Sequence, residues 1–183
     1  MLKWINRLAG VSLIPVFILS FTFTKTDDDY IDWRPDQKLT WEDFKGRPEQ
    51  GADRAALSFI QIHADFGYKN NTLTWHITCR FNKKKSWGKT KTDYILAHEQ
   101  LHFDITEAHA RILNQRLSAY RYNAGTFQQD LDKIYNSTMK EENQMQQAYD
   151  RESNHSIIAG KQAEWQEKIK KLLAETEKYA GYN

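Results

Sequence analysis

The hydrophobic pattern of this chain changes its period once, and this change limits the possible folds more than any other feature. From Leu73 to Phe81, apolar side chains alternate with polar ones, as in a strand with one buried face. The run Leu57–Phe66 has a similar composition, and Tyr68–Asn71 between the two runs has the composition of a turn. Together they predict an antiparallel hairpin whose apolar face must be covered by another layer.

Helical spacing replaces this alternation after Thr92, a residue that can cap a helix. Apolar residues then recur at helical intervals to about Tyr120, and two further helical runs span about 126–149 and 158–179. We therefore expect an α+β fold in which a small antiparallel β-sheet is followed by three long helices. Before and between these elements we expect an irregular lead-in over 32–48, with one helical turn at Trp41–Phe44, and a solvated connector over 83–91.

Composition indicates one folded domain and excludes several classes of protein. The chain has 183 residues, of which 40% are hydrophobic and 13% aromatic, so it is not intrinsically disordered. Its single cysteine, Cys79, excludes an intramolecular disulfide framework and a cysteine-based zinc finger, and we expect it to be packed in a strand. Two of the 26 basic residues lie in residues 1–24, and the others balance the 24 acidic residues. This balance predicts no nucleic-acid partner.

The N-terminus has the layout of an export signal. Met1–Arg7 carries positive charge, and Leu8–Phe23 is an apolar run of 16 residues, shorter than the roughly 20 that a membrane span needs. We expect residues 1–24 to be a cleaved signal peptide, with an uncleaved N-terminal anchor as the alternative. In either case residues 25–183 form one exported domain, periplasmic or secreted, whose only contact with the membrane would be through residues 8–23.

The first long helix contains an H-E-x-x-H motif, formed by His98, Glu99 and His102. Residues four apart lie on one helix face, so the two imidazoles can bind one zinc ion at about 2.0–2.1 Å. Glu99 lies about 100° round the helix, where it can act as the general base for water activated by the metal. The motif predicts a zinc-dependent hydrolase with a zincin-like active-site helix.

A catalytic zinc ion usually has three protein ligands, so the motif lacks one. His109 is about 10 Å along the helix from His102, and Glu107 lies about 140° round from it; we expect both to be structural or surface residues. The dense polar segment Tyr149–His155 ends the second helix, and an antiparallel second helix would bring it close to His98.

From that segment we choose His155 as the third ligand, because neutral imidazole is a common ligand of zinc. Asp150, Glu152 and Glu107 remain alternatives. Asp150 can instead orient a ligand histidine through its ring N–H, and Tyr149 can donate to a developing oxyanion. We expect two other groups to have no part in the chemistry. They are the strand histidines, which we expect at the surface, and the tryptophans, which we expect in or beside the core (His63 and His76; Trp33, Trp41, Trp75, Trp87 and Trp165).

Three stretches of the chain, within roughly Asp32–Ile169, resemble the DUF922 family and its Bacteroidetes-type branch. They are LTWEDFKGRP at 39–48, KTDYILAHEQLHFDI at 91–105 and YDRESNHS at 149–156. The family is described as predicted secreted zinc-dependent proteases. Its H-E-x-x-H maps onto His98, Glu99 and His102, and its Y-D-x-x-T-x-H segment maps onto Tyr149, Asp150 and His155, with Ser153 where threonine is usual. The resemblance implies a protease and favours His155 as a ligand.

The sequence therefore predicts an exported zinc metallopeptidase that holds Zn²⁺ through His98, His102 and His155 and uses Glu99 as general base. Its substrate would be a peptide or protein in the cell envelope or outside the cell. Two alternatives stay open. One is a zinc-stabilised binding module of the cell envelope without turnover, and the other is an amidase acting on a cell-wall peptide with the same chemistry.

Overall fold

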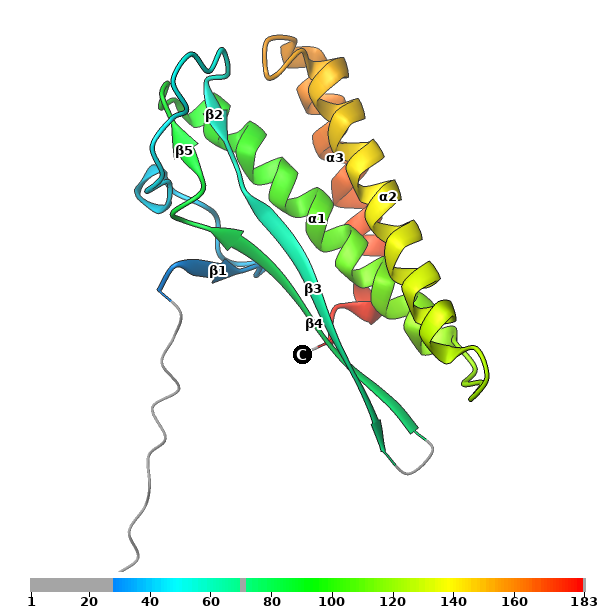
Figure 1. Cartoon of the computed structure of the whole chain (residues 1–183). Helices are drawn as coiled ribbons and strands as arrows, with labels where there is room; N and C mark the ends of the chain where they lie inside the picture. The colour runs from blue at the N-terminus through cyan, green and yellow to red at the C-terminus, as the bar shows by residue number, and fades with distance from the viewer. Residues whose placement is uncertain (1–27, 70–71, 183) are drawn as a thin grey trace, which may run out of the picture.

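A computed structural model describes residues 28–69 and 72–182, and it confirms the α+β prediction. A small antiparallel sheet packs on α1, and α1 lies between the sheet and the other two long helices (Figure 1). The predicted signal peptide lies outside the described residues. None of the helices within the described ranges is long and apolar enough to cross a membrane. The elements are β1 (Tyr30–Asp32), η1 (Trp41–Asp43), β2 (Ala56–Leu57), β3 (Ile60–Lys69), β4 (Thr72–Asn82), β5 (Trp87–Gly88), α1 (Asp93–Ala119), α2 (Phe127–Ser153), α3 (Ala159–Glu175) and η2 (Glu177–Tyr179).

The predicted hairpin forms the main sheet. β3 and β4 pair in antiparallel register from Ile60 opposite Phe81 to Lys69 opposite Thr72, so its strands extend into the segment expected to be the turn. The alternation of β4 places its apolar residues on the face that α1 covers, and Cys79 is buried there as predicted. β1 adds a third strand along the other edge of β4. Three residues are too few for a periodic pattern, which is why β1 was not predicted.

The expected strand Leu57–Phe66 is interrupted at Ser58 and Phe59, and here the prediction was wrong. β2 ends at Leu57 and pairs with β5, whereas β3 begins at Ile60 and pairs with β4. Ser86 holds the break, because its Oγ accepts from the Phe59 amide (2.8 Å) and donates to the Asn82 carbonyl (2.7 Å). The connector over 83–91 is therefore not simply solvated, since it contributes β5 and the buried side chains of Ser86 and Trp87.

The long helix α1 is the centre of the molecule. Its N-terminus is capped by Thr92, whose side chain accepts from the Ile95 amide (3.2 Å). One apolar cluster lies between α1 and the sheet, and a second lies between α1, α2 and α3. α2 runs antiparallel to α1, as expected, and continues one turn past the predicted end at Tyr149 to Ser153 (Figure 1). That extra turn carries Asp150.

The third helix and the aromatic residues agree with the sequence expectations. α3 ends at Glu175 and is followed by the short helix η2, which together cover most of the predicted run. The five tryptophans within the described residues are buried or half-buried, and η1 forms the helical turn expected after Thr40, whose amide donates to Asp43 (2.9 Å). His63 and His76 are exposed on the outer face of the hairpin.

Candidate metal centre

The two histidines of the motif lie one turn apart on the face of α1 that meets α2. His98 is buried and His102 is half-buried, and their Nε2 atoms are 3.2 Å apart. The ring of Tyr149, from the last part of α2, packs on both imidazoles, with centroid distances of 4.5 Å to His98 and 5.0 Å to His102. Both rings are therefore held in place by packing, and both direct Nε2 to the same point.

Asp150 supplies a third atom at that point. Its Oδ1 lies 3.2 Å from His98 Nε2 and 3.1 Å from His102 Nε2. Among the described residues, these three form the group whose ligand atoms all lie within 4.8 Å of one another. The prediction that the end of α2 returns to His98 is thus confirmed, and the residue that reaches both imidazoles is the aspartate.

Hydrogen bonds alone do not account for this triangle of atoms. An Asp150 carboxylate can accept an Nε2–H from each histidine, but the two nitrogens then face each other at 3.2 Å with no acceptor between them. A cation at the centre would bind the lone pairs of both Nε2 atoms and of Asp150 Oδ1, and so would account for all three short distances. Ligands of a tetrahedral zinc ion with bonds of about 2.0–2.2 Å are about 3.3–3.6 Å apart, close to the observed spacing. The donor set therefore fits a metal ion.

The outer contacts of His102 favour the same conclusion. Its Nδ1–H donates to Gln146 Oε1 (2.5 Å), which leaves the Nε2 lone pair available for a metal. The amide of Gln146 is fixed in turn by the carbonyl of His102 (3.0 Å) and by Glu142 (2.8 Å). Sequence reasoning missed Gln146, although it lies four residues before Asp150 and so shares its helix face. His98 has no such contact: within the described part of the chain, its buried Nδ1 has no hydrogen-bond partner.

The charges of this group are strongly coupled. Burial raises the pKa of Asp150, but the hydrogen bonds and charges of His102 and His98 outweigh it and hold that pKa well below its usual value. Burial lowers the pKa of His102, but Asp150 and the nearby Glu99 outweigh it and raise the pKa. The carboxylate and the imidazoles therefore stabilise each other's charged forms.

Glu99 lies beside the group without belonging to it. It is 4% exposed, and its Oε2 accepts a hydrogen bond of 2.6 Å from Ser58 Oγ, at the break between β2 and β3. A cavity of about 230 Å³ is lined by Glu99, Ser58 and the three members of the group. Sequence reasoning missed Ser58, because only the unpredicted break in the strand directs it to the motif.

His155 also lines this cavity, at the start of the loop after α2. Its Nδ1 lies 3.5 Å from Asp150 Oδ1, its side chain is 52% exposed, and it is not a member of the group of three. It is the second of three consecutive residues with positive φ: Asn154 (49°), His155 (50°) and Ser156 (74°). Such a run costs about 1 kcal/mol or more per residue and is typical of functional loops. Its role as a ligand stays a prediction.

Other residues weighed from the sequence are engaged elsewhere. Glu107 is buried and accepts from Arg111 Nε (2.8 Å), and His109 Nδ1 donates to the Ile105 carbonyl (2.9 Å), so both are structural, as expected. Glu152 accepts from Trp165 Nε1 (2.9 Å) on α3. Tyr149 is buried beneath the imidazoles and does not line the cavity, and its hydroxyl has no hydrogen-bond partner among the described residues, so its role as an oxyanion donor stays a prediction.

Comparison with known families gives one match. A family model described as "Bacterial protein of unknown function (DUF922)" matches residues 28–156, which is most of the chain. The chain belongs to the DUF922 family. The match includes the sheet, α1, α2 and all the residues of the candidate metal centre, and it ends just before α3. No curated protein and no solved structure matches this DUF922 chain.

Proposed function

We propose that this DUF922 protein is an exported zinc-dependent hydrolase, most specifically a peptidase. The observation that carries the proposal is the convergence of His98 Nε2, His102 Nε2 and Asp150 Oδ1 at one edge of a cavity that also contains a buried glutamate. Two imidazoles and one carboxylate with an open side are the ligand pattern of catalytic zinc, whereas magnesium and calcium prefer oxygen ligands alone. Export rests on the basic and apolar N-terminal segment.

In this proposal His98, His102 and Asp150 hold the ion. Zinc bound there would supply Lewis acidity, polarising a substrate carbonyl and lowering the pKa of water to about 7. The remaining chemistry belongs to Glu99. Because Ser58 donates to one oxygen of its carboxylate, the other oxygen can take a proton from the attacking water as the new C–O bond forms. The same oxygen then gives that proton to the amine nitrogen when the C–N bond breaks.

The decisive test of turnover compares the full-length, zinc-loaded chain with Glu99→Gln, using dye-labelled casein as substrate. We expect Glu99→Gln to keep one zinc ion per chain and to lose about 10²–10⁴-fold in rate, as expected for loss of a general base. Glu164→Gln is the matched control, since this exposed glutamate on α3 pairs only with Lys161 among the described residues. Equal rates for wild type and Glu99→Gln would exclude Glu99 as base. Metal binding without cleavage of casein or of cell-wall peptides would leave the binding module, and cleavage of cell-wall peptides alone would identify the amidase.

A second comparison decides the third ligand. We expect Asp150→Ala to lose stoichiometric zinc and His155→Ala to retain it, because Asp150, of these two residues, is the one within reach of both imidazoles. Metal content measured by mass spectrometry on both variants separates the two. If His155→Ala loses the zinc and Asp150→Ala keeps it, the sequence prediction is right and the loop 154–156 must move on metal binding.

A further inference from the structure

The hairpin presents one strand edge that no other strand covers. The order of the main sheet is β1-β4-β3, so within the described residues β3 is an edge strand along its whole length. Two hydrogen bonds show which of its backbone groups point outward. The Phe59 carbonyl accepts from Asn82 at the end of β4 (2.8 Å), whereas the Ile62 carbonyl accepts from the Tyr135 hydroxyl of α2 (3.1 Å).

In an antiparallel strand the N–H and C=O groups of one residue point to the same side, and they alternate along the chain. The even-numbered residues of β3 therefore direct their backbone groups away from β4. Beyond Ile62, those of Ala64 and Phe66 point to the uncovered edge. Such an edge is a template for pairing with another extended chain.

This edge begins at the candidate metal centre. Ser58 and Ile60 line the cavity with His98, His102 and Asp150, and β3 leads away from it between α1 and the solvent (Figure 1). The eight residues from Ile60 to Gly67 extend over roughly 26 Å at about 3.3 Å per residue. A polypeptide paired with the whole of this edge would displace the Tyr135 hydroxyl from the Ile62 carbonyl, and would have one part beside the metal and another near the tip of the hairpin.

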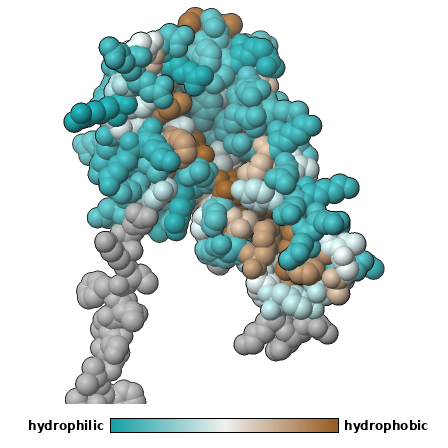
Figure 2. Space-filling model, viewed as in Figure 1, coloured by the Kyte–Doolittle hydropathy of each residue, from teal (hydrophilic) through white to brown (hydrophobic). Residues whose placement is uncertain are grey.

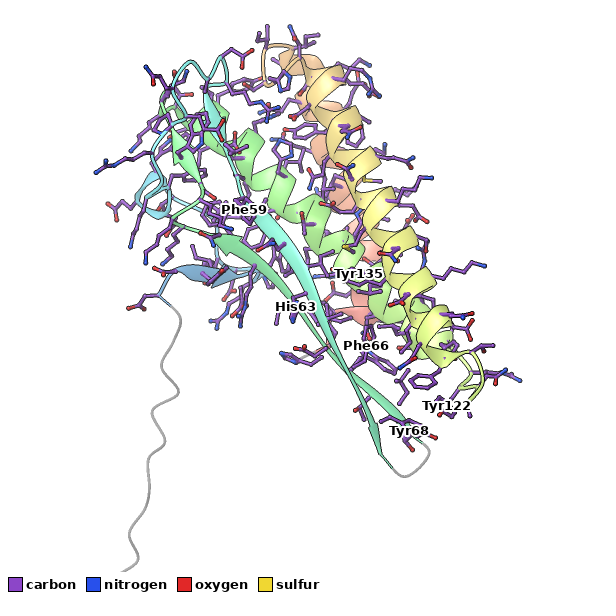
Figure 3. The ribbon with its side chains drawn as sticks, in the orientation of Figure 1. Phe59, His63, Phe66, Tyr68, Tyr122 and Tyr135 are labelled. Carbon is purple, nitrogen blue, oxygen red and sulfur yellow. The ribbon has the colours of Figure 1, made fainter. Side chains whose placement is uncertain are left out.

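Aromatic side chains collect at the far end of the edge. Phe66 and Tyr68 are 40% and 43% exposed, and the ring of Tyr68 stacks on Tyr122, with centroids 4.4 Å apart. Figure 3 shows Phe66, Tyr68, Tyr122 and Tyr135 along the side of β3 that faces α2. Figure 2 shows apolar surface on the same side, close to the end of the hairpin. Exposed aromatic side chains gathered along an unpaired strand are typical of a binding surface.

We propose that the free edge of β3 binds the substrate as an added antiparallel or parallel strand, and that the cluster of Phe66, Tyr68 and Tyr122 contacts its apolar side chains. The substrate class is an extended polypeptide of about eight residues or more. The inference rests on the proposed function in one respect: the bound polypeptide is cleaved only if the protein is a peptidase. A substrate polypeptide is the expected partner because the uncovered edge is continuous with the cavity: Ile60 begins β3, and both Ile60 and Ser58 before it line the cavity.

The test measures binding apart from cleavage. Full-length Glu99→Gln protein is titrated into dye-labelled, reduced and carboxymethylated casein, and fluorescence anisotropy gives the Kd. In this background Ala64→Pro removes one outward N–H and leaves the ladder with β4 intact, so we expect binding about tenfold weaker. Phe66→Ala is the second variant and is expected to weaken binding by a similar factor. His76→Ala is its matched control, because this exposed ring lies on β4, on the other side of β3 from the free edge.

The outcomes separate this proposal from the proposed function. Weaker binding in both variants, with unchanged circular dichroism, supports strand addition even if wild-type protein never cleaves casein. Wild-type cleavage that is unchanged by Ala64→Pro and Phe66→Ala would overturn strand addition and leave the peptidase proposal standing. Failure of casein to bind overturns it as well. A third result would also overturn it. If the protein forms a dimer that Ala64→Pro dissociates, and casein binding stays the same, the edge pairs with a second copy of the chain.

Discussion

Helix α1 contributes to two groups of polar residues that are each centred on buried side chains, and the groups differ in how completely their hydrogen bonds are satisfied. The Arg111 cluster contains Glu107, Arg111, Glu177 and Tyr182. Arg111 donates to Glu107 (2.8 Å), to Glu177 (2.9 Å) and to the Leu173 carbonyl (3.0 Å), and the Tyr182 hydroxyl donates to Glu107. Every member therefore has a hydrogen-bond partner within the cluster, and the cluster joins the C-terminal segment to α1.

The group formed by His98, His102 and Asp150 is arranged differently. Three atoms converge without enough hydrogens to join them, one imidazole nitrogen has no partner within the described residues, and a cavity opens alongside. Burial and charge are common to both groups, so neither property identifies a site. Buried polar atoms that lack hydrogen-bond partners next to a cavity do identify a candidate site, because a structural cluster gains no stability by leaving such atoms unpaired.

The largest expected effect is the loss of metal binding, which should follow from a change in the group of His98, His102 and Asp150 and not from one in the Arg111 cluster. We expect His102→Ala to lose the zinc ion and, with it, the rise in Tm that zinc gives the wild type, because metal binding stabilises only the folded chain. Thermal unfolding with and without zinc measures this. His76→Ala is the control, since this exposed histidine lies on the outer face of the hairpin and should leave the rise unchanged. A full rise in His102→Ala would contradict the assignment.

The second effect concerns stability alone. We expect Arg111→Ala to lower the free energy of unfolding by about 3–5 kcal/mol, because it leaves a buried carboxylate without its cation, and to leave zinc stoichiometry unchanged. Arg80→Ala is the control: its ion pair with Asp32 (2.7 Å) is 40% and 51% exposed and should contribute about 1 kcal/mol or less. Urea denaturation gives the free energy of unfolding of both variants. Equal decreases would mean that the Arg111 cluster stabilises the fold no more than an exposed ion pair does.

A smaller effect tests the outer contact of the metal centre. Gln146→Ala removes the acceptor of His102 Nδ1–H, and we expect zinc affinity to fall by about 10–100-fold while the fold is kept. Competition with a zinc-binding dye measures the affinity. Gln147→Ala, at the exposed neighbouring position, should bind zinc as the wild type does. An unchanged affinity in Gln146→Ala would show that packing by Tyr149 suffices to orient the ring.

The smallest effect is a dependence on pH. Burial raises the pKa of Glu107 above its ordinary value, although Tyr182 and Arg111 oppose this. A carboxyl with a raised pKa in the folded state contributes stability below its unfolded pKa of about 4.3, and this contribution is lost as pH rises through the folded value. We expect the free energy of unfolding of Glu107→Gln to fall less than that of the wild type as pH rises through this window. Urea titrations at several pH values check it, and parallel curves would contradict it.

The sequence was sufficient where a pattern is long and local. The alternation of β4 and the helical period of α1 predicted both elements, and the spacing of His98 and His102 placed their side chains on one helix face. The antiparallel return of α2 also followed from the two helical runs and the short break between them. These features depend on backbone periodicity, which neighbouring residues determine.

Tertiary structure decided the rest. Asp150 reaches both imidazoles because α2 continues one turn beyond its apolar stripe, and His155 follows in a loop of three residues with positive φ, 3.5 Å from Asp150. Ser58 donates a hydrogen bond to Glu99 because the strand is broken at this point, where Ser86, 28 positions later, accepts from the Phe59 amide. The sequence alone determined that two imidazoles share one face of a helix. Which side chains complete that face depends on contacts between distant segments, whose energies arise only after the layers have packed.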